Sequence, residues 1–321
     1  MTALPPFVLS LIQVVGLALI VFTVAAYVIL AERRVIGRMQ ARLGPNRVGP
    51  FGMFQPLADV IKLLTKEDLR PAGATRWLHI VTPIVTLVPV MLIFAVIPVS
   101  PDWHLADLNV GYLYVAAISS IGVYGVALGG WSSNSKYALL GGLRSSAQLI
   151  SYELAQGLAV LGVIAAAGSL SLVHIVQGQF PLPYAVVQPI AFFVYVVASV
   201  AESSRAPFDL PEAEQELGAG YHTEFSSFRF ALFMLSEYLH VVASSALIAV
   251  LFLGGWWPFD GGVLGVLAFA AKMAFFVFVF IWLRATLPRV RYDRLMAFGW
   301  KVLIPLALVN LAIVAVWIAL E

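Results

Sequence analysis

The chain has 321 residues, of which 61% are hydrophobic and only 11% are charged, with a formal net charge of +2. This composition excludes a water-soluble globular domain, in which about a quarter of the residues are charged. The absence of cysteine excludes disulfides, thiolate metal sites and cysteine-held iron–sulfur clusters from this chain.

Long apolar runs follow one another along the sequence. Each approaches the ~20 residues that cross a hydrocarbon layer of ~30 Å as an α-helix, and none alternates as a barrel strand does. We therefore expect an all-α integral membrane protein that forms a single polytopic domain over residues 1–321. The eight predicted spans cover residues 7–30, 80–99, 112–130, 149–168, 185–201, 233–253, 263–283 and 302–320.

The cations are confined to alternate linkers between these spans. Residues 31–79, 131–148, 202–232 and 284–301 hold all the lysines and arginines except Lys272, which lies inside the seventh span. By the positive-inside rule, these four linkers face the cytoplasm and both termini face the outer side. Basic loops can simply set the topology, but long polar linkers on one side also predict a docking surface there.

The first linker contains an amphipathic pattern near residues 55–68. In QPLADVIKLLTKEDL, apolar residues recur at helical spacing, while Asp59 and Lys62 fall on other faces. This pattern predicts a helix lying in the membrane interface, or one packed on a neighbouring subunit. The same linker begins with Glu32, Arg33 and Arg34, which either snorkel at the end of the first span or line a polar opening.

Ionisable residues also occur inside the predicted spans. Glu153 and Glu237 lie a few residues into their spans, and Glu202 ends the fifth, so all three are predicted in the cytoplasmic third of the membrane. His240 follows Glu237 by three positions, on the same helix face. A buried carboxylate pairs, lines water or takes up a proton. Structural contacts between helices remain an alternative for each glutamate, but several at one depth favour a hydrated polar path.

The stretch AESSRAPFDLPEAEQE, residues 201–216, concentrates acids in a chain that has few. Asp209 and Glu212 have the spacing of a capping box, which predicts a short helix that ends near Gly218. A solvated acidic turn would explain the pattern, but the nearby embedded glutamates favour an acidic mouth that leads into the membrane. Its members are Glu202, Asp209, Glu212, Glu214 and Glu216, with Arg205 as the single cation.

Three segments resemble one family. Residues 32–68 and 201–227 are similar to the two signature regions of the H subunits of proton-pumping NADH–quinone oxidoreductase, respiratory complex I, which include mitochondrial NADH dehydrogenase subunit 1. Residues 284–308, RATLPRVRYDRLMAFGWKVLIPLAL, resemble the C-terminal region of the same family. The resemblance covers nearly the whole chain, all eight predicted spans included.

The resemblance implies a subunit that forms the entrance chamber for a quinone and couples its reduction to proton translocation. Ubiquinone or menaquinone would be bound as a substrate, with no FMN, haem or iron–sulfur cluster on this chain. The implied chamber residues are Glu32, Arg33, Arg34, Asp59, Lys62, Glu202, Arg205 and Asp209. The implied proton-coupling residues are Glu153, Glu202, Glu212, Glu214, Glu216 and Glu237.

The resemblance also implies partners and a location. The expected partners are the quinone-reducing subunits of the peripheral arm on the cytoplasmic side, neighbouring small membrane subunits, antiporter-like subunits and membrane lipids, with no nucleic acid. The expected location is the bacterial cytoplasmic membrane, and no activity is expected from the isolated chain. Two other functions remain open: a membrane subunit of a related energy-converting hydrogenase, and a proton-coupled secondary transporter, although no internal repeat supports the latter.

Overall fold

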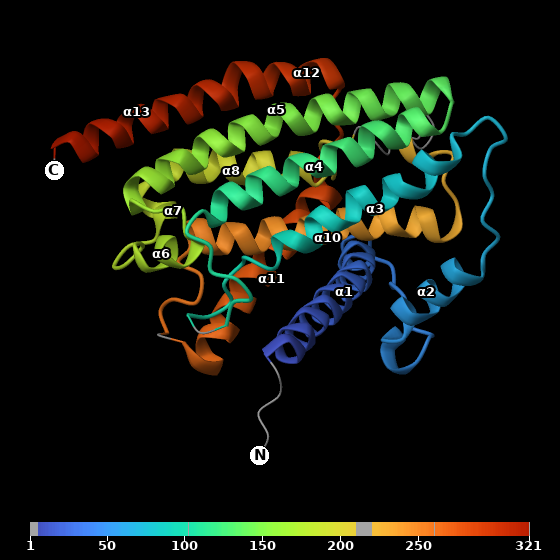
Figure 1. The fold of residues 1–321 in the computed structure, drawn as a ribbon, viewed down its shortest axis with the longest axis horizontal. Helices are drawn as coiled ribbons and strands as arrows, with labels where there is room; N and C mark the ends of the chain where they lie inside the picture. Colours follow the sequence, from blue (N-terminus) through green and yellow to red (C-terminus); the bar gives the residue numbers. More distant parts are fainter. Residues whose placement is uncertain (1–5, 102, 210–219, 260, 321) are drawn as a thin grey trace.

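The computed structural model of the chain describes residues 6–101, 103–209, 220–259 and 261–320. Helices make up most of this part of the chain, and the only β-pairing within it is an isolated bridge between Ser100 and Trp103. The prediction of an all-helical fold is therefore confirmed for the described ranges (Figure 1).

The long helices form a packed bundle. Helix α13 packs on α5, α5 on α4, α4 on α3, and α3 on α10, while α1 and α11 cross this row at a steep angle (Figure 1). The helices are α1 Pro6–Met39, η1 Pro50–Gly52, α2 Gln55–Thr65, α3 Arg76–Ile93, α4 Gly111–Ser132, α5 Lys136–Ala167, α6 Leu172–Gln177, α7 Tyr184–Val187, α8 Pro189–Glu202, η2 Gly220–His222, α10 Ser227–Phe252, α11 Gly262–Thr286, α12 Tyr292–Phe298, η3 Gly299–Leu303 and α13 Ile304–Leu320.

Seven helices in the described residues are long and apolar enough to cross a membrane, against the eight spans predicted. The difference lies in the fifth predicted span, residues 185–201, which the structure divides between α7 and α8 at Gln188. Helix α8 has 14 residues, a length of about 21 Å, which is shorter than a ~30 Å hydrocarbon layer. Pro189 explains the break, because a proline fits the first turn of a helix and cannot continue a preceding one.

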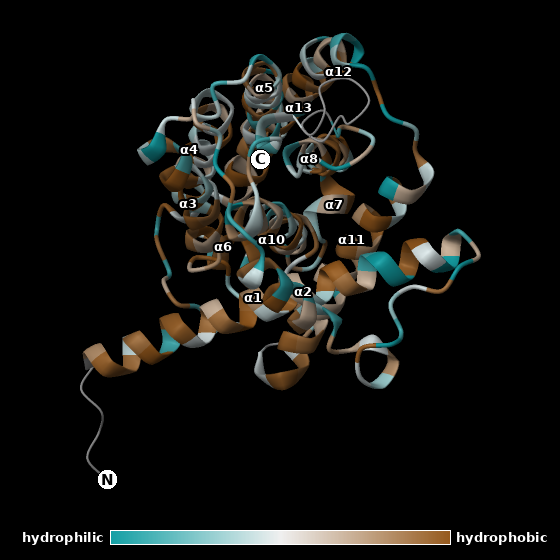
Figure 2. Cartoon of the chain, turned by 90° about the vertical axis from the view of Figure 1, so that its right-hand side faces the viewer, coloured by the Kyte–Doolittle hydropathy of each residue, from teal (hydrophilic) through white to brown (hydrophobic). Residues whose placement is uncertain are grey.

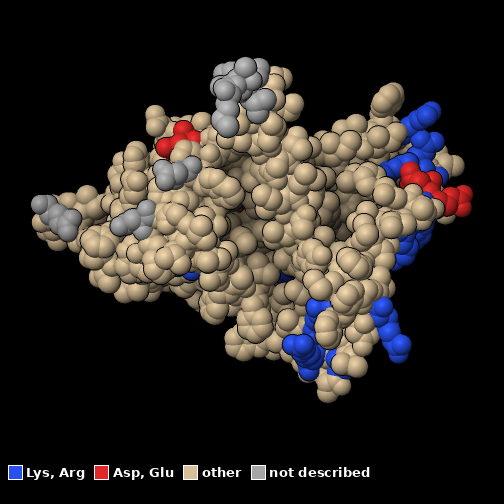
Figure 3. Space-filling view, turned by 90° about the horizontal axis from the view of Figure 1, so that it is seen from below, with Lys and Arg blue, Asp and Glu red and all other residues tan. Residues whose placement is uncertain are grey.

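The linkers expected on one side of the membrane lie together in the fold. Helix α4 ends, and α3, α5 and α10 begin, at the right-hand end of Figure 1, whereas the connections α3–α4 and α10–α11 lie at the left. In Figure 3 most of the visible lysine and arginine surface lies in the right-hand half. The bundle therefore has one cation-rich end.

Helix α10 forms the centre of the bundle. In its most apolar 18-residue window 89% of the residues are buried, against 22% for α1, so α10 is enclosed by protein while α1 presents its surface outward. Figure 2 shows the N-terminal half of α1 projecting from the bundle with mainly hydrophobic residues. This difference explains why the charged residues of α10 must be bonded within the protein, because they have little access to the exterior.

Close contact between α3, α4 and α5 depends on small residues. A Cβ atom on Gly125 of α4 would lie 2.2 Å from Oγ1 of Thr86 on α3, and one on Gly130 would lie 2.5 Å from the carbonyl oxygen of Ala138 on α5. The GVALG sequence at 125–129 has the small-residue spacing that permits close helix packing. This approach brings the polar residues of α4 and α5 within reach of one another.

Lys272, the single cation inside the predicted spans, bonds to the end of α10. Its Nζ donates hydrogen bonds to the carbonyl oxygens of Leu253, Gly255 and Trp257, at 2.6, 2.9 and 2.6 Å. Leu253 is the residue that ends α10, where a carbonyl has no partner within the helix and a cation is favourable. Gly255 and Trp257 belong to the turn that follows, so Lys272 ties α11 to the end of α10 and to this turn.

Replacing Lys272 with methionine is expected to lower the free energy of unfolding by about 1–3 kcal/mol, the cost of leaving buried carbonyls unsatisfied. Methionine retains the apolar stem of lysine, so the decrease in the free energy of unfolding measures the contribution of the hydrogen bonds and of the charge. Thermal unfolding of the purified protein measures it, with the exposed Lys301→Met as the matched control. Equal melting temperatures for the two variants would contradict this role.

Candidate functional site

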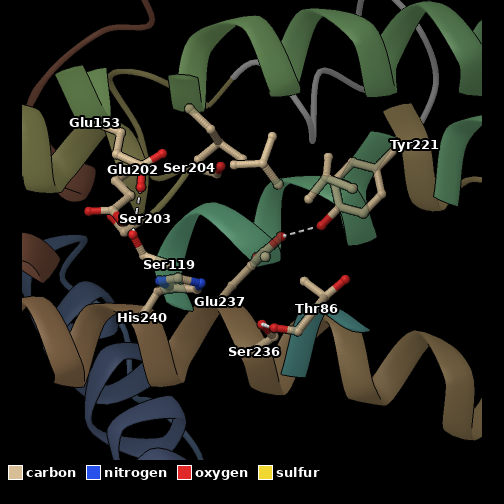
Figure 4. Close-up of a pocket in the computed structure, with 14 residues that line it drawn as sticks. Thr86, Ser119, Glu153, Glu202, Ser203, Ser204, Tyr221, Ser236, Glu237 and His240 are labelled. Carbon is tan, nitrogen blue, oxygen red and sulfur yellow. Dashed lines mark hydrogen bonds between the residues drawn. The ribbon is translucent and has the colours of Figure 1, made fainter. Parts of the chain in front are cut away.

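Two adjoining pockets lie inside the helix bundle. Each has a volume of about 40 Å³, and both are lined by Ser119, Glu153, Glu202 and His240. A water molecule needs about 10–15 Å³ of such space, so the pockets have room for a few waters. Residues from α4, α5, α8 and α10 meet here, as Figure 4 shows.

Glu153 is held by two serines of α4. Its Oε1 accepts hydrogen bonds from Oγ of Ser119 at 2.7 Å and from Oγ of Ser120 at 2.6 Å. Glu202, the last residue of α8, lines both pockets beside it. Two carboxyl groups around one small polar space favour a shared proton or water between them, because like charges repel in a medium of low dielectric.

Glu237 is buried and paired. Its Oε1 accepts a hydrogen bond from the hydroxyl of Tyr221 at 3.3 Å, and its Oε2 lies 3.7 Å from Nη2 of Arg205. The two charged side chains are only 4% and 8% exposed, and the guanidinium of Arg205 also lies 4.1 Å from the ring centre of Tyr238. The single cation of the acidic stretch thus neutralises an acid of α10.

His240 lies one turn after Glu237 on α10, and both side chains line the first pocket. The prediction that they share a helix face is confirmed. Among the described residues, no group of three or more histidine and acidic side chains could hold a metal ion.

The helices that carry these acids begin earlier than the apolar runs. Helix α5 starts at Lys136 and α10 at Ser227, so Glu153 lies near the middle of its helix and Glu237 about three turns into its own. Hydropathy marks the apolar part of a helix, whereas backbone hydrogen bonding continues through polar residues beyond it.

A second polar cluster joins α1, α2 and α11. Nη1 of Arg33 lies 2.8 Å from Oδ2 of Asp59, and Nε2 of Gln55 donates to Oδ1 of Asp59 at 3.0 Å. Glu32 forms an ion pair with Arg284 of α11. Arg34 also donates a hydrogen bond to the carbonyl oxygen of Phe51. Four of the predicted chamber residues, Glu32, Arg33, Arg34 and Asp59, therefore connect α1 with α2, η1 and α11. Another of them, Lys62, is exposed on α2.

Tyr238 interacts with residues of both clusters. Its ring lies under the guanidinium of Arg205, and it interacts electrostatically with Glu32 and Arg284. The predicted chamber residues Glu32 and Arg205 are therefore near the same aromatic side chain. Asp209 is half-buried at the end of a described segment, while Glu212, Glu214, Glu216 and the predicted short helix lie outside the described residues.

Sequence reasoning missed the groups that bond to the acids. Ser119 and Ser120 are adjacent hydroxyls inside an apolar run, a signal that could have identified them as donors. Arg284 lies in the last turn of α11, but nothing in the sequence pairs it with Glu32, which is 252 residues earlier. Tyr221, in η2, gives no such signal either.

Comparison with known proteins identifies the family. The profile of the family described as NADH dehydrogenase matches residues 12–315. The H subunit of NADH-quinone oxidoreductase from Syntrophotalea carbinolica is 54% identical, over 93% of this chain and 92% of its own. An H subunit from Geobacter metallireducens is 53% identical, over 93% of both chains, and that of Geobacillus kaustophilus is 52% identical, over 92% and 90%. The chain therefore belongs to the NADH dehydrogenase family, and these relatives within it are H subunits of NADH-quinone oxidoreductase.

Proposed function

We propose that this chain is the membrane subunit of NADH–quinone oxidoreductase, respiratory complex I, that forms the quinone entrance chamber and couples quinone reduction to proton translocation. The observation that carries the proposal is the meeting of Glu153, Glu202 and Glu237 around pockets with room for water. Buried acids beside water inside a helix bundle are typical of proton paths.

The ion pair of Arg205 and Glu237 would make the proton path sensitive to a change of charge at the quinone. A quinone reduced nearby takes up protons, and the change in charge alters the balance between guanidinium and carboxylate. The two side chains are desolvated, so a change of one unit charge there has a larger effect than it would in water. Glu237 then gains or loses a proton, and the change passes on to Glu153 and Glu202.

The second cluster is suited to a chamber entrance. In α2, the side chains of Leu57, Val60, Ile61 and Leu64 are all exposed, which fits a helix lying in the membrane interface beside a prenyl tail. The ion pair of Arg33 and Asp59 fixes this helix to the end of α1. Glu202, Arg205 and Asp209 would continue the polar wall, with Lys62 at its rim.

The cation-rich end of the bundle supports a position in the bacterial cytoplasmic membrane with this end inward and both termini outward. Quinone-reducing subunits of the peripheral arm would dock on it. The outward apolar surfaces of helices such as α1 would contact lipids, small membrane subunits and antiporter-like subunits. The quinone, ubiquinone or menaquinone, is the substrate of this site.

The test of this function is the combined replacement Glu212→Gln, Glu214→Gln and Glu216→Gln in the assembled complex. The acidic linker is proposed to change its proton affinity as quinone is reduced, so NADH-driven quinone reduction and proton translocation should both fall severalfold. Vesicles containing the purified complex report both rates. The double variant Glu67→Gln and Glu224→Gln, which removes two carboxylates outside the acidic linker, is the control. Unchanged rates in the triple variant would contradict the coupling role.

The entrance is tested separately by Asp59→Ala. This change removes the partner of Arg33 and loosens α2, so the Michaelis constant for quinone is expected to rise severalfold while the maximum rate changes little. Initial rates over a range of short-chain quinone concentrations measure it. Arg34→Ala is expected to act in the same direction. Normal kinetics in a fully assembled complex would count against the chamber assignment.

A further inference from the structure

The acids of the site fall into two groups that bond in different directions. Glu237 bonds to Tyr221 and Arg205, whereas Glu153 bonds to Ser119 and Ser120 of α4. Figure 4 shows the carboxylate of Glu237 turned toward Tyr221 and away from Glu153 and Glu202. A proton that moves from one group to the other passes through the first pocket, which all three acids line.

His240 lies beside both groups. It lines the first pocket with all three acids and the second with Glu153 and Glu202. The second pocket continues past His240 along the same face of α10 to Ser244 and Leu247. In Figure 4 the imidazole lies on the side of Glu153 and Glu202, one helical turn beyond Glu237. His240 thus stands where the two water spaces adjoin.

The imidazole ring of His240 makes no hydrogen bond to any other residue in the described ranges. Buried polar groups are nearly always bonded, so the ring has capacity for water in the pockets it faces. His79 is a useful contrast, because it is buried, stacks on Phe225 at 3.9 Å between ring centres, and lines neither pocket. His79 therefore serves packing, whereas the side chain of His240 faces the two pockets.

We propose that His240 is a proton-transfer residue that connects the Glu237 group with the Glu153 and Glu202 group. This inference rests on the proposed proton coupling and names a further residue in it. A neutral imidazole accepts a proton on one ring nitrogen and releases the proton of the other. One proton enters from the first pocket and one leaves into the second, and a ring flip restores the starting tautomer.

Other titratable groups face the same spaces and share in any pH dependence. They are Tyr112 of α4, Glu153 of α5, Tyr195 and Glu202 of α8, Tyr221 of η2 and Glu237 of α10, whereas α3 contributes only Thr86 and Ile93 to the lining. The hydroxyls of Ser119 and Ser244 complete the polar lining. Unlike these groups, His240 shares a helix face with Glu237 and also lines both pockets.

The test compares His240→Gln and His240→Asn in the purified complex in vesicles. Both keep a polar amide of similar size but cannot relay a proton as imidazole does. We expect coupled quinone reduction and proton translocation to fall by about tenfold or more, with the Michaelis constant for quinone unchanged. The pH profile of turnover should change shape, because one titrating group is gone. His174→Gln, on the exposed side of α6, is the control.

The outcomes separate this inference from the function on which it rests. Wild-type rates and pH profile in both amide variants overturn the role of His240. So does a loss of rate with an unchanged pH profile, or a failure of both variants to assemble, since either marks a packing residue. Glu153→Gln is measured in parallel. If it is inactive while the His240 variants are normal, only the present inference fails, whereas normal rates in all variants also remove the proposed coupling.

Discussion

Replacing Arg205 with methionine is expected to cause the largest loss of stability of any single change in the site. The substitution leaves the carboxylate of Glu237 buried without its cation, and removing one partner of a buried ion pair costs about 3–5 kcal/mol. The amount of assembled complex in membranes and its thermal unfolding temperature should both fall. Quinone reduction should fall with them.

The double variant Arg205→Met with Glu237→Gln isolates the cause. A neutral glutamine needs no cation and can still accept the hydrogen bond from Tyr221, so assembly should recover while proton translocation does not. If the double variant is as unstable as Arg205→Met alone, then the instability comes from lost packing against Tyr238 rather than from the unpaired charge.

Glu153→Gln is expected to abolish coupled turnover without loss of assembly. Glutamine has the size of glutamate, and its amide oxygen can still accept from Ser119 and Ser120, but it cannot take up a proton. Proton transfer groups contribute rate factors of about 10² to 10⁴, so proton translocation and quinone reduction should fall by about a hundredfold or more. Vesicles that contain the complex report both rates.

The matched control for this variant is Glu67→Gln, which removes an exposed carboxylate after α2. It should leave both rates near those of the parent complex. A Glu153→Gln complex with parental rates would show that Glu153 is only a structural contact between α4 and α5, the alternative that the sequence left open.

Features that depend on local periodicity were predictable from the sequence. The spacing of Leu57, Val60, Ile61 and Leu64 predicted a helix at 55–68, and the structure has α2 at Gln55–Thr65. The offset of three between Glu237 and His240 placed both on one face. Such patterns follow from 3.6 residues per turn, so they hold without knowledge of the neighbours.

Features that depend on distant contacts were not predictable. The pairing of Glu32 with Arg284 joins residues 252 apart, and no periodicity links them. Residues 185–201 read as one continuous span because hydropathy averages over the break at Gln188, where the side chain instead donates a hydrogen bond to the carbonyl oxygen of Gly162. Hydropathy reports the environment of a segment, whereas its helix boundaries depend on which backbone groups are bonded.

The ties between the start of α10 and the segment after α2 also bear on how the protein is made. Oγ of Ser227 donates to the carbonyl oxygens of Leu63 and Lys66, at 2.9 and 2.8 Å, 164 and 161 residues earlier in the chain. At about 5–20 residues per second, a ribosome takes roughly 10–30 s to supply Ser227 after that segment. During this interval α2 is held by the membrane surface and by its ion pair with α1. A chain interrupted before α10 would therefore leave the residues that follow α2 without their tie to Ser227 and open to membrane proteases, unlike the finished protein.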